Sequence, residues 1–136
     1  MNSDPIHCLI LDDDLERHKK FRTWLNEPGV KLTFVETAVE AIAKLSSEMF
    51  HCVFLDHDLG GETYVDSGRE DCGMEVVRQL KAGTIAQDQR CLFVVHTMNT
   101  EAGSEMVLKL KDRGYANVVY LGFFQMVRDN GPNLNF

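Results

Sequence analysis

Two apolar runs of this sequence each end in aspartates. Residues 8–11 lead directly into Asp12 and Asp13, and residues 52–55 lead directly into Asp56. Carboxylates held close together repel one another, so a cluster of them is costly unless a cation or protons neutralise the charge. Carboxylate oxygens are the ligands that Mg²⁺ and Mn²⁺ prefer in proteins. The sequence therefore predicts a site for Mg²⁺ or Mn²⁺, with Asp12, Asp13 and Asp56 as ligands.

A fourth carboxylate, Asp58, has two interpretations. If the strand continues past Asp56, the side chain of Asp58 points to the same side, where it is a further metal ligand or a general base. Alternatively, Asp58 is a turn residue ahead of Gly60 and Gly61, because Asp is common in turns. Gly60 permits either a turn or the close approach of a substrate to the backbone.

Three polar residues follow another apolar run, 91–95: His96, Thr97 and Asn99. An imidazole can donate a hydrogen bond to a phosphoryl oxygen, relay a proton or bind a metal. We expect His96 to be catalytic, because it ends a strand and faces the carboxylates. Thr97 and Asn99 are neutral hydrogen-bonding groups that either contact a phosphate or cap the following helix.

Further phosphate-binding candidates are His57, Arg17 and Arg69. The side chain of His57 points away from that of Asp56 by strand parity, so its membership of the site is an open alternative. Either arginine can reach a phosphate, although a solvated surface position is the commoner role. The polar segment 59–72 is a candidate lid over the site.

Alternating strand and helix patterns position these residues. Helical periodicity separates the apolar runs, with Gly83 and Gly114 ending two of the helices, and only Phe123 to Asp129 can form a last, short helix. Such alternation predicts an α/β fold with a doubly wound parallel sheet, and ligands bind such sheets beyond the carboxyl ends of the strands. We expect one domain, 1–136, with five strands near residues 7–11, 31–36, 51–55, 91–95 and 117–121.

Composition limits the choice of partner and compartment. The 136 residues carry a net charge of −7, which argues against binding to a nucleic-acid backbone. We find neither a membrane-length apolar stretch nor a signal-peptide pattern, and the four cysteines form no C-x-x-C pair. We therefore expect a cytoplasmic protein with reduced cysteines, in which a bound divalent ion lets a small anion enter the acidic site.

The whole pattern resembles the receiver domains of two-component response regulators. Asp12 and Asp13 match the acidic pair of that family, Asp56 matches its phosphoacceptor, and residues 73–78 look like the start of its third helix. The resemblance implies a flavodoxin-like fold with strand order 2-1-3-4-5. It also implies that the backbone carbonyl of Asp58 contacts the metal.

This chain departs from ordinary receivers at several positions. His96 stands where receivers have Ser or Thr, no lysine follows Lys111, and the connection between Asp56 and Gly73 is longer. These departures resemble a narrower group, the receiver-like domains proposed to process cyclic phosphates. The matching residues are Asp12-Asp13, Asp56-His57-Asp58-Leu59-Gly60, and His96 with Asn99.

The resemblance implies a metal-dependent domain that processes a phosphate ester, in the first place a cyclic phosphate or cyclic nucleotide. In this hypothesis Asp56, His96 and Asp58 are the catalytic residues. One alternative is a stand-alone receiver of a phosphorelay, phosphorylated on Asp56 and acting on a separate signalling protein. A second alternative is a non-catalytic pseudo-receiver that serves as an interaction module.

Overall fold

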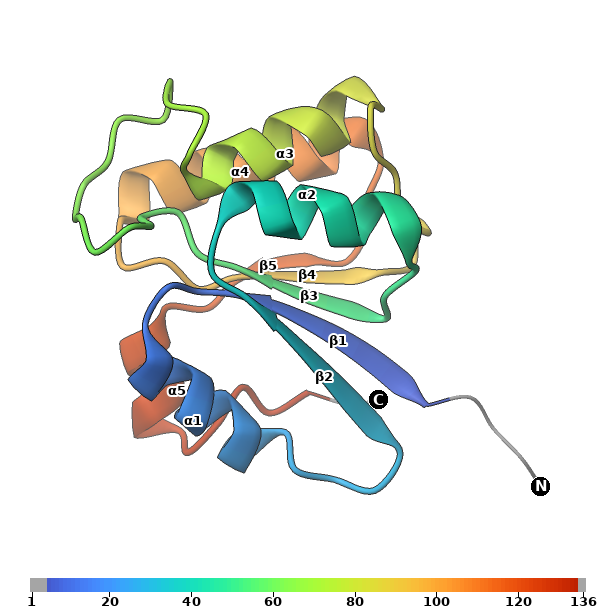
Figure 1. The fold of residues 1–136 in the computed structure, drawn as a ribbon, viewed down its shortest axis with the longest axis vertical. Coiled ribbons are helices and arrows are strands. Elements are labelled where there is room, and N and C mark those ends of the chain that lie inside the picture. The colour runs from blue at the N-terminus through green and yellow to red at the C-terminus, as the bar shows by residue number, and fades with distance from the viewer. Residues whose placement is uncertain (1–4, 135–136) are drawn as a thin grey trace.

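Five parallel strands form the centre of the computed structural model, which describes residues 5–134 (Figure 1). Their order in the sheet is β2-β1-β3-β4-β5, as the resemblance to receivers implies. β1, β3 and β4 are almost fully buried because helices cover both faces of the sheet, which explains their continuous apolar runs. The strands are β1 (Ile6–Leu11), β2 (Val30–Val35), β3 (Cys52–Leu55), β4 (Leu92–Val95) and β5 (Val118–Tyr120).

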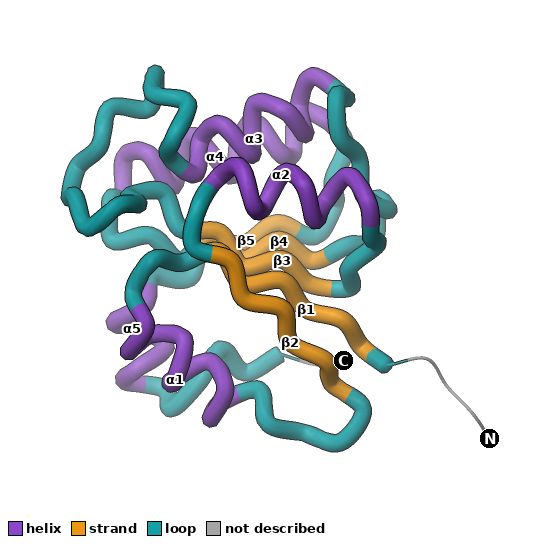
Figure 2. The backbone as a smooth tube through the Cα atoms, in the orientation of Figure 1, coloured by secondary structure: helices purple, strands orange, loops and turns teal. Residues whose placement is uncertain are grey.

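Helices connect the strands and cover both faces of the sheet (Figures 1 and 2). α1 and α5 lie on one face, and α2, α3 and α4 lie on the other, so the sheet is doubly wound as predicted. The last helix is short, also as predicted. The helices are α1 (Leu15–Trp24), α2 (Ala38–Ser47), α3 (Gly73–Ala82), α4 (Thr100–Arg113) and α5 (Phe123–Arg128). Within residues 5–134, no helix has the length and apolar character needed to cross a membrane.

Capping residues that can be recognised in the sequence begin and end several of the helices. Asp14 caps α1, since its carboxylate accepts hydrogen bonds from the backbone N–H groups of Glu16 and Arg17. Gly83 and Gly114 end α3 and α4 in the left-handed conformation that glycine adopts without strain. The four cysteines are free, as expected.

An aromatic cluster fills the space between the sheet and the α1/α5 layer. Phe21 lies in its middle, with ring centroids 5.0 Å from Phe54, 5.6 Å from Trp24 and 6.0 Å from Phe123. The ring of His96 joins this cluster, 5.3 Å from Phe21. The aromatic layer therefore holds one side of the predicted site in place.

Candidate functional site

Three buried side chains meet at the carboxyl ends of β1, β3 and β4. Asp12, Asp56 and His96 each offer one ligand atom, and these atoms all lie within 4.8 Å of one another. The Nε2 atom of His96 is 2.9 Å from Oδ2 of Asp12. Parallel strands bring their carboxyl ends to the same edge of the sheet, which is why three residues far apart in the sequence meet here.

Burial and the crowding of charge set the ionisation of the two carboxyl groups. Burial raises the pKa of Asp56 to about 6, and the Asp12 carboxylate adds to this, while His96 and Arg17 oppose it. Burial also disfavours the charged form of Asp12. The hydrogen bond and charge of His96, the backbone N–H of Asp14 and the charge of Arg17 outweigh that effect and hold the pKa of Asp12 below its usual value. The metal-free site therefore carries negative charge that its surroundings only partly balance.

The imidazole of His96 has one polar partner. An ionised carboxylate can only accept, so Nε2–H donates to Asp12. The other nitrogen, Nδ1, is the buried side-chain polar atom that lacks a hydrogen-bond partner among residues 5–134. Phe21 and Phe54 pack against the ring. His96 is thus within reach of the carboxylates, and the packing of its ring keeps it there.

Asp13 and Asp58 lie at the rim of this group and also hold the segment 59–72. Both line a small pocket of about 190 Å³ together with Asp56 and Arg17. The carboxylate of Asp13 accepts a 2.6 Å hydrogen bond from the backbone N–H of Gly61. It is not one of the three groups whose ligand atoms cluster, so its role as a metal ligand stays a prediction.

The carboxylate of Asp58 holds the backbone of the segment 59–72. It accepts hydrogen bonds from the backbone N–H groups of Tyr64 (2.9 Å) and Val65 (3.0 Å) and from Nδ1–H of His57 (2.7 Å). Burial disfavours its charged form, but these hydrogen bonds outweigh burial and lower the pKa of Asp58. These bonds account for its position without a metal, so a catalytic or ligand role for Asp58 stays a prediction.

The ring nitrogens of His57 contact Asp58 and the segment 59–72, and not the carboxylates of Asp12 and Asp56. Its Nε2 atom is 2.9 Å from Oγ of Ser67, within the segment 59–72. Burial lowers the pKa of the imidazole, but hydrogen bonds with Cys72 and Asp58 outweigh it and raise the pKa above the usual value. Arg78 of α3 reinforces the same segment, with its guanidinium donating to the carbonyl groups of Ser67 and Arg69. The structure therefore shows the segment 59–72 tied to the strand ends.

The remaining candidates have structural partners. The guanidinium of Arg69 pairs with Asp71 (2.7 Å) and Glu62 (2.9 Å). Asn99 caps α4, accepting from the backbone N–H of Ala102 at 3.2 Å. Thr97 Oγ1 accepts from the backbone N–H of Asn99, and Gly60 adopts the left-handed conformation, with a φ of 74°. Phosphate binding by Arg69, Thr97, Asn99, His57 and Gly60 stays a prediction.

Two residues, Arg17 and Gly73, make contacts at the site that the sequence pattern did not predict. Nη1 of Arg17 lies 3.6 Å from Oδ2 of Asp12 and 3.6 Å from Oδ2 of Asp56, whereas the pattern favoured a solvated surface position. Gly73, the first residue of α3, packs so closely on the strand end that a Cβ there would be 1.8 Å from the backbone oxygen of Asp56. The contacts that Arg17 and Gly73 make with Asp56 have no local signal in the sequence, because Asp56 is distant from both residues along the chain.

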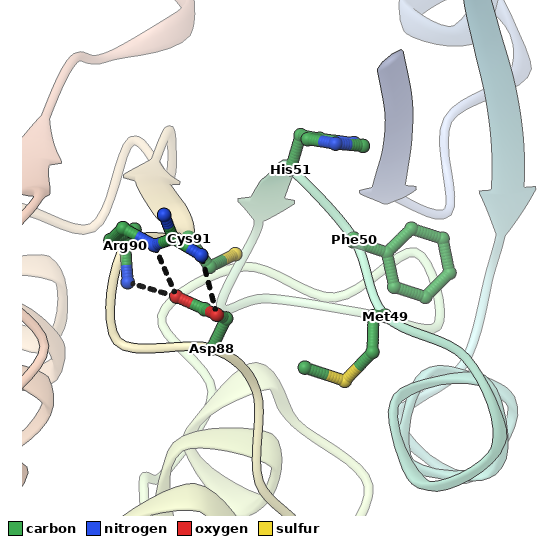
Figure 3. Close-up of a pocket in the computed structure, with 6 residues that line it drawn as sticks. All are labelled: Met49, Phe50, His51, Asp88, Arg90 and Cys91. Atoms are coloured by element: carbon green, nitrogen blue, oxygen red, sulfur yellow. Dashed lines mark hydrogen bonds and ion pairs between the residues drawn. The ribbon is translucent and has the colours of Figure 1, made fainter. Parts of the chain in front are cut away.

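A larger pocket, of about 480 Å³, opens at the opposite end of the sheet (Figure 3). Met49, Phe50, His51 and Cys91 line it together with Asp88 and Arg90, whose side chains pair with each other at 3.1 Å. Burial, followed by the charge of Asp88, raises the pKa of the Cys91 thiol to about 12, so this thiol is a poor nucleophile. The acidic cluster brings together groups that can bind a metal and transfer a proton, whereas the described residues that line the larger pocket do not. We therefore take the acidic cluster as the candidate site.

We expect the segment 59–72 to open when Asp58 is replaced. Asp58→Ala leaves the N–H groups of Tyr64 and Val65 without their acceptor and should cost about 1–3 kcal/mol of stability. Limited proteolysis, with the cleavage sites located by mass spectrometry, should then show faster cutting within 59–72. Glu70→Ala, an exposed change in the same segment, is the control. Equal cleavage rates in both variants would show that Asp58 does not hold the segment.

Comparisons with known proteins agree with this geometry. The model of one family, the cyclic-phosphate processing receiver domain, matches residues 7–112. No curated protein matches the chain.

Several solved structures with a similar fold are response regulators or their receiver domains. The phosphorylated cyanobacterial phytochrome response regulator RcpA has a TM-score of 0.62 and 15% identity, over 93% of this chain and 89% of its own. The Thermotoga maritima response regulator TrrA, in complex with Mg²⁺ and BeF, has a TM-score of 0.60 and 18% identity, over 90% of this chain and 93% of its own. A Burkholderia pseudomallei response regulator with a phosphorylated aspartic acid, calcium ion and citrate has a TM-score of 0.59 and 16% identity, over 93% of this chain and 67% of its own. At these identities the likeness shows the fold alone.

Proposed function

The chain belongs to the family of cyclic-phosphate processing receiver domains. We propose that it is a metal-dependent domain that acts on a phosphate ester, and that the preferred ester is a cyclic phosphate or cyclic nucleotide. The observation that carries this proposal is the contact between His96 and Asp12, 2.9 Å, inside the group of three potential ligands. A routine phosphoswitch needs only a hydroxyl at this strand end, whereas an imidazole can also hold and transfer a proton.

The residues present fit a divalent cation. Two buried carboxylates close to each other, one of them with its pKa raised to about 6, favour an added positive charge. Asp12 and Asp56 would hold Mg²⁺ or Mn²⁺, with Asp13 and Asp58 at the rim as further candidate ligands. Such an ion supplies a Lewis acid for a phosphoryl oxygen and lowers the pKa of a bound water.

The chain's own groups have distinct roles in this proposal. His96 holds a proton at Nε2, which Asp12 accepts in this structure. In the proposal this proton passes to an oxygen of the phosphate ester once that oxygen takes the place of the Asp12 carboxylate beside the imidazole. Asp56 is a metal ligand or a transient nucleophile. A site of about 190 Å³ suits a phosphate group better than the whole of a large substrate, so the rest of the substrate would extend past Met98 and Thr63 into solvent.

The second candidate is a stand-alone receiver phosphorylated on Asp56. The position of the Asp56 carboxyl group on the wall of this pocket favours it, as do structural neighbours that are phosphorylated response regulators. In that case the partner is a separate signalling protein. In either case we place the protein in the cytoplasm.

One experiment separates the two candidates. The protein is incubated with Mg²⁺ or Mn²⁺ and, in separate reactions, with cyclic mononucleotides, 2′,3′-cyclic phosphates and acetyl phosphate. We expect turnover of a cyclic ester and a loss of about 100-fold or more in His96→Ala, since general acid–base groups contribute that much. His51→Ala, at the opposite end of the sheet, is the matched control.

The outcomes are distinct. Turnover that is lost in His96→Ala, without detectable phosphoprotein, supports the enzyme. Stable phosphorylation that is abolished in Asp56→Asn, with no cyclic ester consumed, would overturn the enzyme and leave the receiver.

A further inference from the structure

We propose that Arg17 is the phosphate-binding cation of this site, and that in the metal-free protein its guanidinium lies where it competes with a divalent ion for Asp12 and Asp56. This inference rests on the proposed function, because it assigns a residue to the substrate of the same site. It goes beyond that function in predicting opposite effects of one side chain on the metal and on the phosphate.

The first observation behind this proposal is the position of the Arg17 guanidinium. Nη1 of Arg17 is 3.6 Å from one carboxylate oxygen of Asp12 and 3.6 Å from one of Asp56, and Nε is 3.9 Å from Asp14. These separations are ion-pair distances, longer than hydrogen bonds. The guanidinium therefore balances the charge of the two carboxylates without being locked to either of them.

The second step is the surface on which the arginine rests. The guanidinium carbon of Arg17 lies 4.8 Å from the ring centroid of Phe123, the first residue of α5. Arginine stacks on aromatic faces and keeps its N–H groups free around its edge. Phe123 follows β5 after Leu121 and Gly122, so the end of the strand that lacks a lysine here supplies an aromatic ring instead. The cation reaches the site from α1.

The third step is the balance of charge around the pocket. Among the described residues that line the pocket, Arg17 is the one with a cationic side chain, and the others include Asp13, Asp14, Asp56 and Asp58. A phosphate group entering this acidic pocket needs positive charge from the protein as well as from a metal. The side chain of Arg17 is 25% exposed, so it can turn toward a ligand without unfolding its helix.

Opposite consequences follow for the two ligands. A divalent ion and the guanidinium are attracted to the same two carboxylates and repel each other, so removal of the guanidinium strengthens metal binding. A phosphate group loses its fork of N–H donors, so the same change weakens phosphate binding. Replacement of a residue with a merely structural role would weaken both metal binding and phosphate binding.

The test compares Arg17→Gln with Arg22→Gln. Arg22 is the matched control, because it lies in the same helix and also stacks on an aromatic ring, that of Phe34 at 4.5 Å, away from the carboxylates. Mg²⁺ alone is titrated first, and inorganic phosphate is then titrated in saturating Mg²⁺, both by calorimetry. The fluorescence of the single tryptophan, Trp24, is a second readout, since its ring lies 5.5 Å from that of Phe123.

In Arg17→Gln we expect Mg²⁺ to bind about threefold more tightly or better, and inorganic phosphate to bind at least about tenfold more weakly. Arg17→Lys, which keeps the charge but not the planar fork, should restore part of the phosphate affinity. Arg22→Gln should match the wild type in both titrations. A cooperative thermal unfolding transition will show that each variant is folded.

Three results would overturn the inference: weaker Mg²⁺ binding in Arg17→Gln, unchanged phosphate binding in Arg17→Gln, or equal effects in Arg22→Gln. A wild-type protein that binds Mg²⁺ and phosphate but turns over no cyclic ester would overturn the proposed enzyme alone. A wild-type protein that binds no divalent ion would overturn both.

Discussion

Replacement of Gly73 by alanine is expected to destabilise the protein and to abolish divalent-metal binding together. Gly73 begins α3, and its backbone N–H donates to the carbonyl of His57 at 2.8 Å. An added Cβ would lie 1.8 Å from the backbone oxygen of Asp56 and 2.9 Å from Cα of His57. Both are backbone atoms at a strand end, so they cannot move aside as a flexible side chain would.

The clash must therefore displace either α3 or Asp56. Overpacking of this kind typically costs about 1–3 kcal/mol, and we expect the upper part of that range. The displacement also separates Asp56 from Asp12 and His96, so the three potential ligands no longer converge.

Chemical denaturation and Mg²⁺ titration measure the two effects. Gly122→Ala is the control, because a Cβ there meets only the hydroxyl group of Tyr120, at 3.9 Å, and its φ of −58° suits alanine. If Gly73→Ala unfolded at the same denaturant concentration as the wild type, the close approach of α3 to the strand end would be wrong.

Replacement of Asp56 by asparagine is expected to abolish metal binding while making the metal-free protein more stable at pH 7.5. The carboxyl group of Asp56 is buried next to Asp12, and its pKa rises from 3.8 to about 6. A carboxyl whose pKa is raised on folding favours the folded state while it is protonated and disfavours it once it ionises. The folded state therefore binds more protons than the unfolded state between pH 4 and pH 6, and stability falls as the pH rises through that window.

The size of this effect follows from the shift in pKa. About two pH units correspond to roughly 3 kcal/mol of lost stability above pH 6, as an upper limit, because Arg17 and His96 already offset part of the charge. Asn has a similar shape and no charge, so Asp56→Asn should recover about 1–3 kcal/mol at pH 7.5 and little at pH 4. The pH dependence of the wild-type protein between these values should be flattened in the variant.

Thermal and chemical unfolding at several pH values, in chelator, test this prediction. Asp14→Asn is the matched control, because Asp14 is exposed and Asn is an equally good helix cap. A less stable Asp56→Asn protein at pH 7.5 would show that the carboxylate is not under electrostatic strain. Addition of Mg²⁺ should stabilise the wild type and leave Asp56→Asn unchanged.

Part of this protein is determined by patterns that are local along the chain. The apolar runs ending at Leu11, Leu55 and Val95 predict buried parallel strands, because a strand covered on both faces has no polar positions. A parallel sheet brings the carboxyl ends of its strands to one edge, so the meeting of Asp12, Asp56 and His96 follows from topology. The short last helix was predictable because few residues separate the last strand from Gly131 and Pro132, whereas the strand order was implied by the resemblance to receivers.

The loops were not predictable in this way. Strand parity and turn chemistry gave two interpretations of Asp58, and neither predicted the hydrogen bonds that its carboxylate accepts from the backbone of the segment 59–72. Asp13 pairs with the backbone of Gly61, and Arg17 with the ring of Phe123, across long separations in sequence. The sequence by itself determined the sheet, its order of elements and the acidic edge, since these depend on short-range periodicity and a general rule of topology. Only the tertiary structure decided which charges face one another at that edge, because those contacts join residues whose proximity exists only after the chain has folded.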